Sequence, residues 1–580
     1  MNWLLSAPPA LFVAVAALAV LVSRRLGLAL SGIALACVAG WALSVPDGVG
    51  PTATFLGFEL LVVHVDPVAR LVALVFGGFG LAAVGYAGLV GLDRTRLACA
   101  LVYTAAALWT VTVGDWLSLL VGWELLAVSA TLLLWLGRGE AVRAGYRYAL
   151  AHAIGGTALF VAIAFHAVSV GTAPDALWFD GGLAGEAALF AGFGIAVNAA
   201  AVGVHAWLPD AYARPHVASS VFLCAYTTKV AVYTAHRAFP EGNLLLAYAG
   251  GGMAVYGAGY ALAQKDMRRL LAYHIQAQVG YMLAGIGIGS TLGIAGGFFH
   301  LFNNVLYKGL LFMLAGILIL RFGEERLDRF GALGTAMPAV ALAFALAALS
   351  IAGMPGTNGF ISKGMVLDAA SEAGARPLYW LLLAGSVGTA ASFAKFGYYA
   401  FLDGGSIASD RKRGMGRTHA AVTLPLAGLC VLLGLRHDLQ FALLPVGEVW
   451  KTDPYTASYM AEKIAFGTAG VAGFLLAKPL LKRLDGGTDV NALHDPLALY
   501  GARAVSGSIE RAFARADRVG EVLAARAVDL TRGEEAPVRS LLPIWLRGED
   551  GELSATLAIG PSVALVLCVL AVSLLIALLL

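Results

Sequence analysis

Residues 117–136, LSLLVGWELLAVSATLLLWL, form a run of twenty almost wholly apolar residues with one carboxylate, Glu124, near the middle. About twenty apolar residues in a helix are long enough to cross the hydrocarbon core of a bilayer. A charge at the bilayer centre costs roughly 2.5–3.5 kcal/mol, so a retained one faces the protein interior or water and is a candidate functional group. The run therefore predicts a transmembrane helix whose acid needs an explanation.

The composition of the whole chain also indicates a protein that lies in a lipid bilayer. Of 580 residues, 59% are hydrophobic and only 13% are charged, which indicates a multi-pass protein of the cell membrane. The net charge of +3 comes from scattered Lys and Arg and does not suggest a nucleic-acid partner. The five cysteines each stand alone in an apolar run, so we expect no metal site, no cofactor and no catalytic chemistry of the chain's own.

Apolar runs of spanning length follow one another along the chain. They begin near residues 8, 26, 66, 97, 115, 147, 187, 217, 243, 271, 293, 337, 378, 418, 458 and 556. The sequence thus predicts an all-α polytopic membrane protein with about 14–16 transmembrane helices. The N-terminus lacks the basic region of a cleavable signal and is interpreted as the first span.

The basic residues of the short loops predict the orientation. Alternate loops carry Lys and Arg, for example Arg24 and Arg25 or Lys265, Arg268 and Arg269, whereas the intervening loops 46–64 and 171–186 are acidic or neutral. Because basic loops stay in the cytoplasm, we expect the N-terminus outside.

One segment, 484–553, departs from the pattern of packed spans. Within it, IERAFARADRVGEVLAARAVDLTR (509–532) places apolar residues on one helical stripe and arginines elsewhere, which predicts a lateral amphipathic helix at the cytoplasmic interface. The competing interpretation is a soluble catalytic domain, but the segment has no core-sized apolar set and no nucleotide motif. Residues 554–580 then form a final transmembrane helix.

Glu124 is one of many ionisable or polar groups inside the predicted spans. The others are Asp66, Asp115, His152, His205, Lys229, His274, His300, Lys308, Lys363 and Lys395. Buried lysines and carboxylates can exchange protons near neutral pH. A row of such groups therefore predicts a proton wire.

Two stretches sharpen this hypothesis. In HLFNNVLYKGLL, His300, Asn304 and Lys308 recur every four residues and so share one helix face at about 6 Å intervals; alternatively, His300 and Asn304 only hydrogen-bond between helices. In SIAGMPGTNGFISKGM, Pro355 and Gly356 predict a broken helix facing a polar cavity. The alternative is a simple turn that leaves Lys363 near the surface.

Several motifs resemble one family in the expected order. HAWLPDAYARPHVASSVFLCAYTTKVAVYTAHR resembles its W-L-P-D-A loop followed by a lysine-bearing helix, and AQKDMRRLLAYHIQAQVGYMLAGIGIG is similar to Q-x-D-x-K-R-L-x-A-Y-S-S-I-S-Q-x-G-Y. FFHLFNNVLYKGLLFMLAGILI resembles H-L-x-x-H-A-x-x-K-A-L-L-F, and MPGTNGFISKGM resembles G-x-P-x-x-x-G-F-x-x-K. The family is the antiporter-like subunits shared by respiratory complex I, membrane-bound hydrogenases and Mrp-type Na⁺/H⁺ antiporters. The match covers about residues 60–402 and leans toward the D-type branch of the Mrp antiporters.

The resemblance implies two inverted five-helix repeats within a fourteen-helix core, broken seventh and twelfth helices, and proton translocation along charged midplane residues. The implied regions are 1–96 (N-terminal helices), 97–240 and 241–402 (the two repeats), 403–483 (C-terminal helices), and the interfacial segment and final helix given above. Glu124 matches the fifth-helix glutamate of the family, and Lys229, Lys308 and Lys363 match its later lysines. His274 stands where the family more often has serine.

Two departures from the family pattern stand out. Asn198 occupies the position of the seventh-helix lysine that normally partners the glutamate, and Asn304 replaces the second histidine of the eleventh-helix motif. We expect Lys229 to supply the missing cation for Glu124.

Four functional classes follow from the sequence. The first is a proton-translocating, D-type member of a multisubunit Mrp-type cation/proton antiporter. The second is a proton-pumping member of a complex I-like or hydrogenase redox complex, and the third is the cation-coupled membrane component of an inorganic-carbon uptake system. The fourth, a structural scaffold, is disfavoured by the buried ionisable groups. The first three require other membrane subunits as partners.

The site residues fall into two groups. The predicted proton-translocation residues are Glu124, Lys229, His274, His300, Lys308, Lys363 and Lys395. The predicted supporting or gating residues are Asp66, Asp115, His152, Asn198, His205, Asn304 and Pro355.

Overall fold

The computed structural model describes residues 3–403, 417–444 and 450–483. These residues all belong to one compact unit. The predicted interfacial segment 484–553 and the predicted final helix 554–580 lie outside the described residues.

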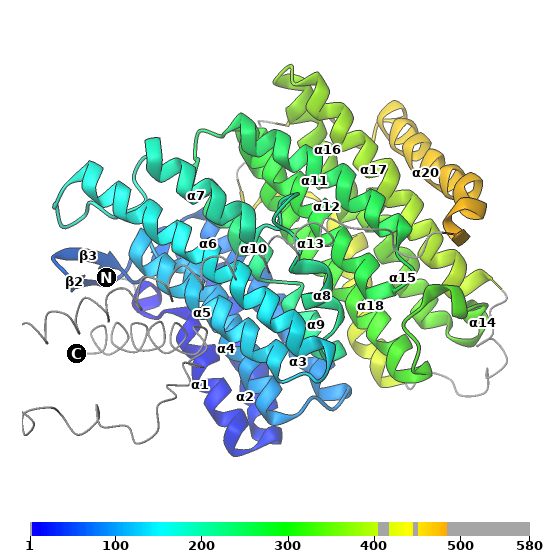
Figure 1. Ribbon diagram of the computed structural model, residues 1–580, viewed down its shortest axis with the longest axis horizontal. Helices are drawn as coiled ribbons and strands as arrows, with labels where there is room; N and C mark the ends of the chain where they lie inside the picture. Colours follow the sequence, from blue (N-terminus) through cyan, green and yellow to red (C-terminus); the bar gives the residue numbers. More distant parts are fainter. Residues whose placement is uncertain (1–2, 404–416, 445–449, 484–580) are drawn as a thin grey trace, which may run out of the picture. The chain divides into compact units, whose positions relative to one another are not determined.

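Helices make up most of the described chain (Figure 1). The first are η1 (Trp3–Ser6), α1 (Pro9–Val22), α2 (Arg24–Ser44), α3 (Pro67–Leu89), α4 (Arg94–Thr112), α5 (Trp116–Trp135), α6 (Glu140–Val170), α7 (Gly185–Asn198), α8 (Leu208–Ala213), α9 (Val217–Leu223) and α10 (Thr227–Ala238). There follow α11 (Leu244–Ala263), α12 (Met267–Ile288), α13 (Thr291–Phe322), η2 (Leu327–Arg329), α14 (Leu333–Ala336), α15 (Pro338–Ala352), α16 (Asn358–Glu372), α17 (Arg376–Gly397), η3 (Tyr398–Leu402), α18 (Arg417–Leu435), α19 (Asp438–Phe441) and α20 (Ala457–Arg483).

Local sequence signals set where many of these helices begin. The side chains of Asp93, Asn243 and Ser290 each accept a hydrogen bond from a backbone N–H in the first turn of α4, α11 and α13. This satisfies donors that a helix start leaves without an intrahelical partner. Proline opens α15 at Pro338, where its fixed φ suits a helix start.

Eight described helices are long and apolar enough to cross a membrane: α2, α3, α4, α5, α6, α13, the continuous segment Arg376–Leu402 and α20. Four shorter apolar helices accompany them, at Pro9–Val22, Gly185–Asn198, Pro338–Ala352 and His419–Leu435. The chain is therefore an all-α, multi-pass membrane protein. Each apolar run predicted to begin before residue 484 coincides with a helix.

The loop before α3 contains two short antiparallel strand pairs that the sequence did not predict. Strands β1 (Gly48–Val49) and β4 (His64–Val65) pair with each other, as do β2 (Thr52–Phe55) and β3 (Phe58–Leu61). The inner hairpin turns at Leu56 and Gly57, both with positive φ. Such turns match the twist of paired strands, so a loop expected only to be acidic or neutral forms a compact hairpin.

Helices α11 and α12 pack at close range through glycines. A Cβ at Gly250 would lie 2.4 Å from the backbone oxygen of Gly280, and a Cβ at Gly280 would lie 2.3 Å from that of Gly250. Small residues permit this backbone approach, the usual device where helices associate within a membrane. The contact fixes the position of α12, which carries His274.

Three interruptions divide helices in the middle of the fold. Helix α7 ends at Asn198 and α8 begins only at Leu208, while residues 224–226 separate α9 from α10. Residues 353–357 separate α15 from α16, with Gly353 and Gly356 at positive φ. The last interruption is the break predicted from Pro355. Helix ends carry carbonyl and amide groups without intrahelical partners, and these groups come to lie among the buried polar residues.

Candidate functional site

Glu124 lies on α5, where it is half-buried against α6. A Cβ at Gly156 of α6 would approach Oε1 of Glu124 to 1.9 Å, so the carboxylate occupies the space that this glycine leaves open. No described Lys, Arg or His lies within ion-pair distance of it. The acid therefore packs against backbone rather than against a cation.

Asn198, the last residue of α7, is close to the same part of α6. A Cβ at Gly155 would lie 3.1 Å from its Oδ1, and both amide atoms of Asn198 are buried without a hydrogen-bond partner in the described chain. Glu124 and Asn198 thus lie against consecutive glycines. The structure places a neutral amide where a lysine was expected from the resemblance.

The expectation that Lys229 supplies the cation for Glu124 is wrong in this structure. The ammonium of Lys229 donates to the backbone oxygen of Cys224 at 2.8 Å and to the hydroxyl of Thr228 at 3.3 Å. Cys224 directly follows α9, so its carbonyl belongs to the negative end of that helix. The break between α9 and α10 therefore provides an acceptor that competes with the more distant acid.

Three hydroxyl groups surround the same break. The hydroxyl of Thr227 lies 2.7 Å from that of Tyr103 and 2.9 Å from that of Tyr148. On α6, His152 stacks on Tyr148 at 3.7 Å between ring centroids and donates through Nδ1 to the Tyr148 backbone oxygen. This cluster extends the polar region from α6 to the neighbourhood of Lys229.

Lys308 and His274 share one aromatic neighbour, Phe393 of α17. The ammonium of Lys308 lies 5.6 Å from the centre of this ring, and the centroid of the His274 imidazole lies 4.8 Å from it. All polar side-chain atoms of both residues are buried, and they have no hydrogen-bond partner among the residues that the structure describes. An unpaired buried ammonium is costly, which makes Lys308 a candidate functional group.

His300 joins three helices through hydrogen bonds. Its Nδ1 lies 3.0 Å from the hydroxyl of Ser362 on α16, and its Nε2 lies 3.2 Å from Oε1 of Gln278 on α12. The hydroxyl of Tyr307 contacts both Gln278 and His300 at 3.5 Å, and Asn304 donates to Tyr307 at 3.5 Å. His300 thus forms hydrogen bonds between helices, as the structural alternative to a proton wire expected. Its two ring nitrogens also connect separate polar groups, Ser362 and Gln278.

Lys363, on α16, is deeply buried. It is only 3% exposed, its ammonium has no hydrogen-bond partner within residues 3–403, 417–444 and 450–483, and it lies 4.8 Å from the ring centre of Tyr281. A simple turn at Pro355 was expected to leave this lysine near the surface, so the broken-helix interpretation is the one that fits. The neighbouring Ser362 connects this region to His300.

Lys395 has a different environment. Its ammonium donates to the backbone oxygens of Leu262 at 2.7 Å and Gln264 at 2.5 Å, at the C-terminal end of α11. It also lines a cavity of about 280 Å³ beside the basic loops, together with Lys265, Asp328 and Lys482. Partial burial raises the pKa of Asp328 in this cavity. The hydrogen bond and charge of Arg326 outweigh that effect and hold the pKa of Asp328 below its usual value.

Structural contacts account for two predicted supporting residues. Asp66 accepts from the backbone N–H of Ala69 at 2.7 Å, which caps α3, and pairs with Arg237 at 2.6 Å. Asp115 caps α5 by accepting from Ser118 at 2.7 Å, and it also accepts from Leu61 of the hairpin. His205 is buried beside the ring of Tyr256, with 4.9 Å between ring centroids.

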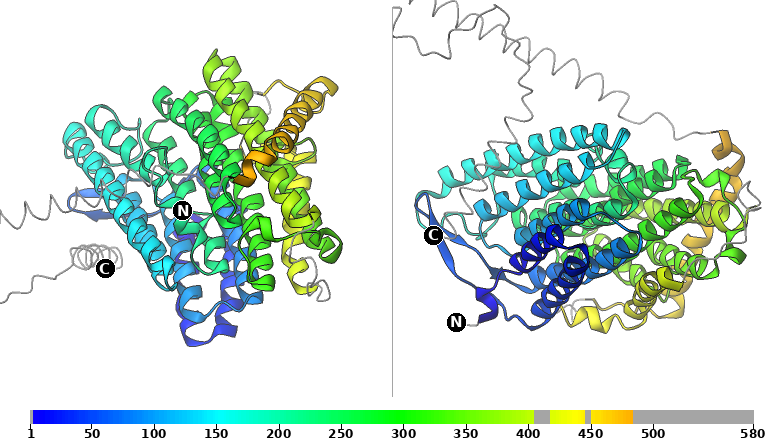
Figure 2. Two further views of the ribbon diagram at one scale, coloured as in Figure 1. Left: turned by 45° about the vertical axis from the view of Figure 1, so that its right-hand side comes forward. Right: turned by 90° about the horizontal axis from the view of Figure 1, so that it is seen from below.

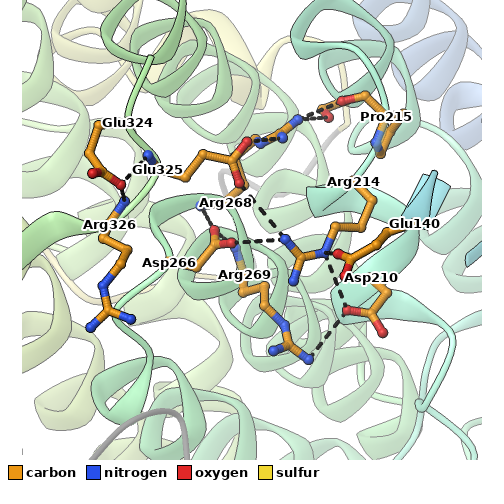
Figure 3. A network of polar contacts seen from close by, with 11 residues as sticks. Glu140, Asp210, Arg214, Pro215, Asp266, Arg268, Arg269, Glu324, Glu325 and Arg326 are labelled. Atoms are coloured by element: carbon orange, nitrogen blue, oxygen red, sulfur yellow. Dashed lines mark hydrogen bonds and ion pairs between the residues drawn. The ribbon is translucent and has the colours of Figure 1, made fainter. Parts of the chain in front are cut away.

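An ion-pair network lies beside α8 (Figure 3). Arg214, just after α8, lies 3.1 Å from Glu140 of α6 and 3.5 Å from Asp266, which caps α12. Arg269 pairs with Asp210 of α8 at 3.3 Å, and Arg268 pairs with Glu325 at 2.5 Å. The network fixes α8, which follows the break at Asn198, to α6, α12 and the segment after α13.

Comparison with known proteins places this architecture in a family. The family model described as NADH:quinone oxidoreductase/Mrp antiporter, TM, matches residues 113–392. The N-type subunit of the NADH-quinone oxidoreductase of Desulforudis audaxviator (strain MP104C) is 30% identical over 371 residues, which cover 60% of this chain and 74% of that protein. The chain belongs to this antiporter-like family.

Other relatives come from different complexes. The D-type subunit of the Na⁺/H⁺ antiporter of Alkalihalophilus pseudofirmus is 30% identical over 267 residues, covering 44% of this chain and 54% of that protein. Among solved structures, a chain of the Mrp complex from Dietzia sp. DQ12-45-1b aligns with a TM-score of 0.69 and 22% identity, covering 82% of this chain and 98% of that one. A chain of respiratory complex I from Thermus thermophilus aligns with a TM-score of 0.67 and 24% identity, covering 81% and 99%. This chain and the two solved chains therefore share one fold.

The segment matched by the family model contains most of the buried polar residues. Glu124, Lys229, Lys308 and Lys363 lie inside it, whereas Lys395 lies beyond its end at residue 392. The structure adds partners that the sequence reasoning missed, chiefly Tyr103, Tyr148, Thr227, Gln278 and Ser362. Gln278 follows His274 by four residues, so the two share a helix face and Gln278 could have been predicted from its spacing, as Lys308 was.

Proposed function

We propose that this chain moves protons across the membrane along its buried polar residues, as the D-type subunit of a multisubunit Mrp-type cation/proton antiporter. The observation that carries this proposal is the unpaired burial of Lys308 and Lys363. Both ammonium groups are buried, and neither has a hydrogen-bond partner in the part of the chain that the structure describes. A lysine kept only for structure would be paired, because an isolated buried charge is strongly unfavourable. Lysines that take up and release protons account for this arrangement.

The hydrogen bonds support a route between the two lysines. Lys308 and His300 lie on the same face of α13, and His300 contacts Gln278 and Ser362. Ser362 directly precedes Lys363. A neutral imidazole accepts a proton on one nitrogen and donates from the other, so His300 is suited to relay protons between the two lysines through intervening water.

In the first half of the chain, the proposed route begins at Glu124 and continues to Lys229. The hydroxyls of Tyr103, Tyr148 and Thr227 lie along this part of the route. His274 and Lys395 complete the proposed set, the latter next to the cavity at the basic loops. His152, Asn198, His205, Asn304 and Pro355 are proposed as supporting residues around it.

We further propose that residues 97–240 and 241–402 are two inverted repeats of five helices each. The first contains α4, α5, α6, α7 with α8, and α9 with α10; the second contains α11, α12, α13, α15 with α16, and α17. The breaks at Asn198 and at 353–357 interrupt the fourth member of each set. Breaks in corresponding positions of two repeats are typical of transporter sites.

The remaining regions complete a proposed chain of 14–16 spans. Residues 1–96 and 403–483 contribute flanking transmembrane helices, 484–553 an interfacial amphipathic segment and 554–580 the last span. The basic loops support an N-terminus outside the cell and a cytoplasmic position for the network around Arg214.

A second candidate function is proton pumping within a redox complex. The match to the N-type subunit of an NADH-quinone oxidoreductase, which covers 74% of that protein, favours it. In that case electron transfer belongs to partner subunits, and the role of this chain in moving protons is unchanged.

The test is to purify the native complex with its partner subunits and reconstitute it into vesicles. Proton movement in response to Na⁺ or K⁺ gradients, with small antiporter subunits as partners, supports the antiporter assignment. Redox subunits and proton movement that depends on a reductant support the second function. A chain that co-purifies with no membrane partner, and moves no protons, contradicts both.

A further inference from the structure

Helix α20 buries one charged side chain, Lys463, on the face that packs against the rest of the fold. The buried residues of this helix are Lys463, Gly467, Gly470, Phe474 and Leu481, which recur at helical spacing on one face. The helix packs against α17 at the edge of the described structure (Figures 1 and 2). Lys463 is only 7% exposed. A lysine on the packed face of a membrane helix is costly to retain.

Lys463 and Lys363 line the same small cavity. Its walls include the two lysines and Ser386, together with Gly353, Gly364 and Gly467. About 20 Å³ is open to a water-sized sphere, which is enough for one water molecule. The ammonium of Lys363 has no hydrogen-bond partner among the described residues, so a water in this cavity is a suitable acceptor for its proton.

Glycines from separate elements keep this space open. A Cβ at Gly364 of α16 would lie 2.5 Å from the hydroxyl of Tyr459, and a Cβ at Gly467 of α20 would lie 2.5 Å from Cε of Met354. A Cβ at Gly353, in the break before α16, would lie 3.1 Å from Cδ of Lys363. The close packing of α16 and α20 around Lys363 thus depends on residues without side chains.

Lys463 also pairs with a partly exposed acid. Its ammonium donates to Oε1 of Glu462 at 2.8 Å, and the Glu462 side chain is 42% exposed. Both residues lie near the start of α20, whereas Lys482, at the other end of the helix, lines the cavity beside the basic loops. Glu462 therefore lies near the end of α20 that is opposite those loops.

We propose that Lys463 carries protons from Lys363 to Glu462 and so forms the release route on the side opposite the basic loops. This inference rests on the proposed function. Protonated Lys463 passes a proton to the carboxylate of Glu462, which releases it to water. Neutral Lys463 then accepts a proton, through the water in the cavity, from the ammonium of Lys363. One proton leaves Lys363 and one reaches the outer solution, so charge balances at each step.

The decisive variant is Lys463→Arg in the complete complex, reconstituted into vesicles. Arginine keeps the charge and the ion pair with Glu462 but does not release its proton at any physiological pH. We expect the rate of proton movement to fall at least about tenfold, while the complex assembles as in the wild type. Removal of a positioned proton-transfer group usually costs this much or more. Lys463→Met is expected to show the same loss. The matched control is Lys478→Met, which removes a less buried lysine of the same helix that bonds to Tyr398 instead.

The outcomes separate the release route from the proposed function. If Lys463→Arg and Lys463→Met assemble and transport at the wild-type rate while Lys363→Met is inactive, the release route is wrong and the function stands. If Lys363→Met also transports at the wild-type rate, protons do not pass through Lys363 and the proposed function is wrong for residues 241–402. If Lys463→Arg is active and only Lys463→Met is inactive, Lys463 acts as a structural charge and the proposal is overturned.

Discussion

The carboxylate of Glu124 occupies the space beside Gly156 of α6, where a Cβ would approach its Oε1 to 1.9 Å. This contact places the acid without the help of a cation from the described residues. Replacement of Gly156 by alanine would force either the carboxylate or the helix to move. We expect Gly156→Ala to reduce proton movement by about tenfold or more, because misplaced proton-transfer groups lose efficiency steeply.

The matched control for that variant is Gly259→Ala in α11. A Cβ at Gly259 meets no described atom within 4 Å, so alanine there is expected to leave transport unchanged while slightly favouring the helix. Equal transport by both alanine variants would show that the position of the carboxylate at Gly156 does not matter.

A second prediction concerns the amide that stands in place of a lysine. Asn198→Lys would add an ammonium beside Gly155, next to the glycine that contacts Glu124. We expect it to pair with Glu124 and to raise thermal stability in detergent, with a coupling energy of at least about 1 kcal/mol in a double-mutant cycle with Glu124→Gln. The same stabilisation in the presence and absence of the carboxylate would mean that the two side chains do not meet.

A third prediction tests the relay between the two unpaired lysines. His300→Phe would remove the bonds to Gln278 and Ser362 while keeping an aromatic ring. We expect proton movement to fall by about 10²-fold, a loss typical of removing a positioned acid–base group. Gln440→Leu, which removes a buried hydrogen bond to Asn303, is the control for general damage to the core and is expected to retain transport.

A fourth prediction follows from the ion pair at the start of α3. Burial raises the pKa of Asp66, but the charge and hydrogen bond of Arg237 outweigh this effect and hold the pKa below its usual value. A depressed pKa in the folded state means that the pair stabilises the fold at neutral pH, and that this contribution is lost as the pH falls through the folded-state pKa.

Asp66→Asn is therefore expected to lower the free energy of unfolding at pH 7 by roughly 1–3 kcal/mol, measured by thermal unfolding in detergent. The difference from wild type should shrink below pH of about 4. The control is Asp438→Asn, because Asp438 pairs with Arg436 at an exposed position and should contribute little. Equal effects of the two substitutions would contradict a special role for the Asp66 pair.

The positions of most helices along the chain could be predicted, because a long apolar run indicates a segment that crosses the membrane. Pro355 and Gly356 identified a broken helix for a local reason as well, since proline removes a backbone donor. The pairing of buried side chains could not be predicted, because it depends on contacts between helices distant in sequence. Lys229 was expected to face Glu124, yet the carbonyl of Cys224, exposed by a break that the sequence did not reveal, lies 2.8 Å from its ammonium.

The position of Lys463 could not be predicted from the sequence either. In YMAEKIAF its neighbour Glu462 makes it resemble an ordinary charged helix end. Only the packing of α20 on α17 and the cavity beside Lys363 reveal that this lysine faces inward.

The most direct test of the central claim is proton movement by the reconstituted complex carrying Lys363→Arg. Arginine keeps a buried positive charge on α16, just after its break from α15, but does not release its proton. Transport that falls to background, in a complex that assembles at the wild-type level, is the result that a proton-carrying lysine predicts. Transport at the wild-type rate would show that Lys363 supplies only a fixed charge and that protons do not pass through it.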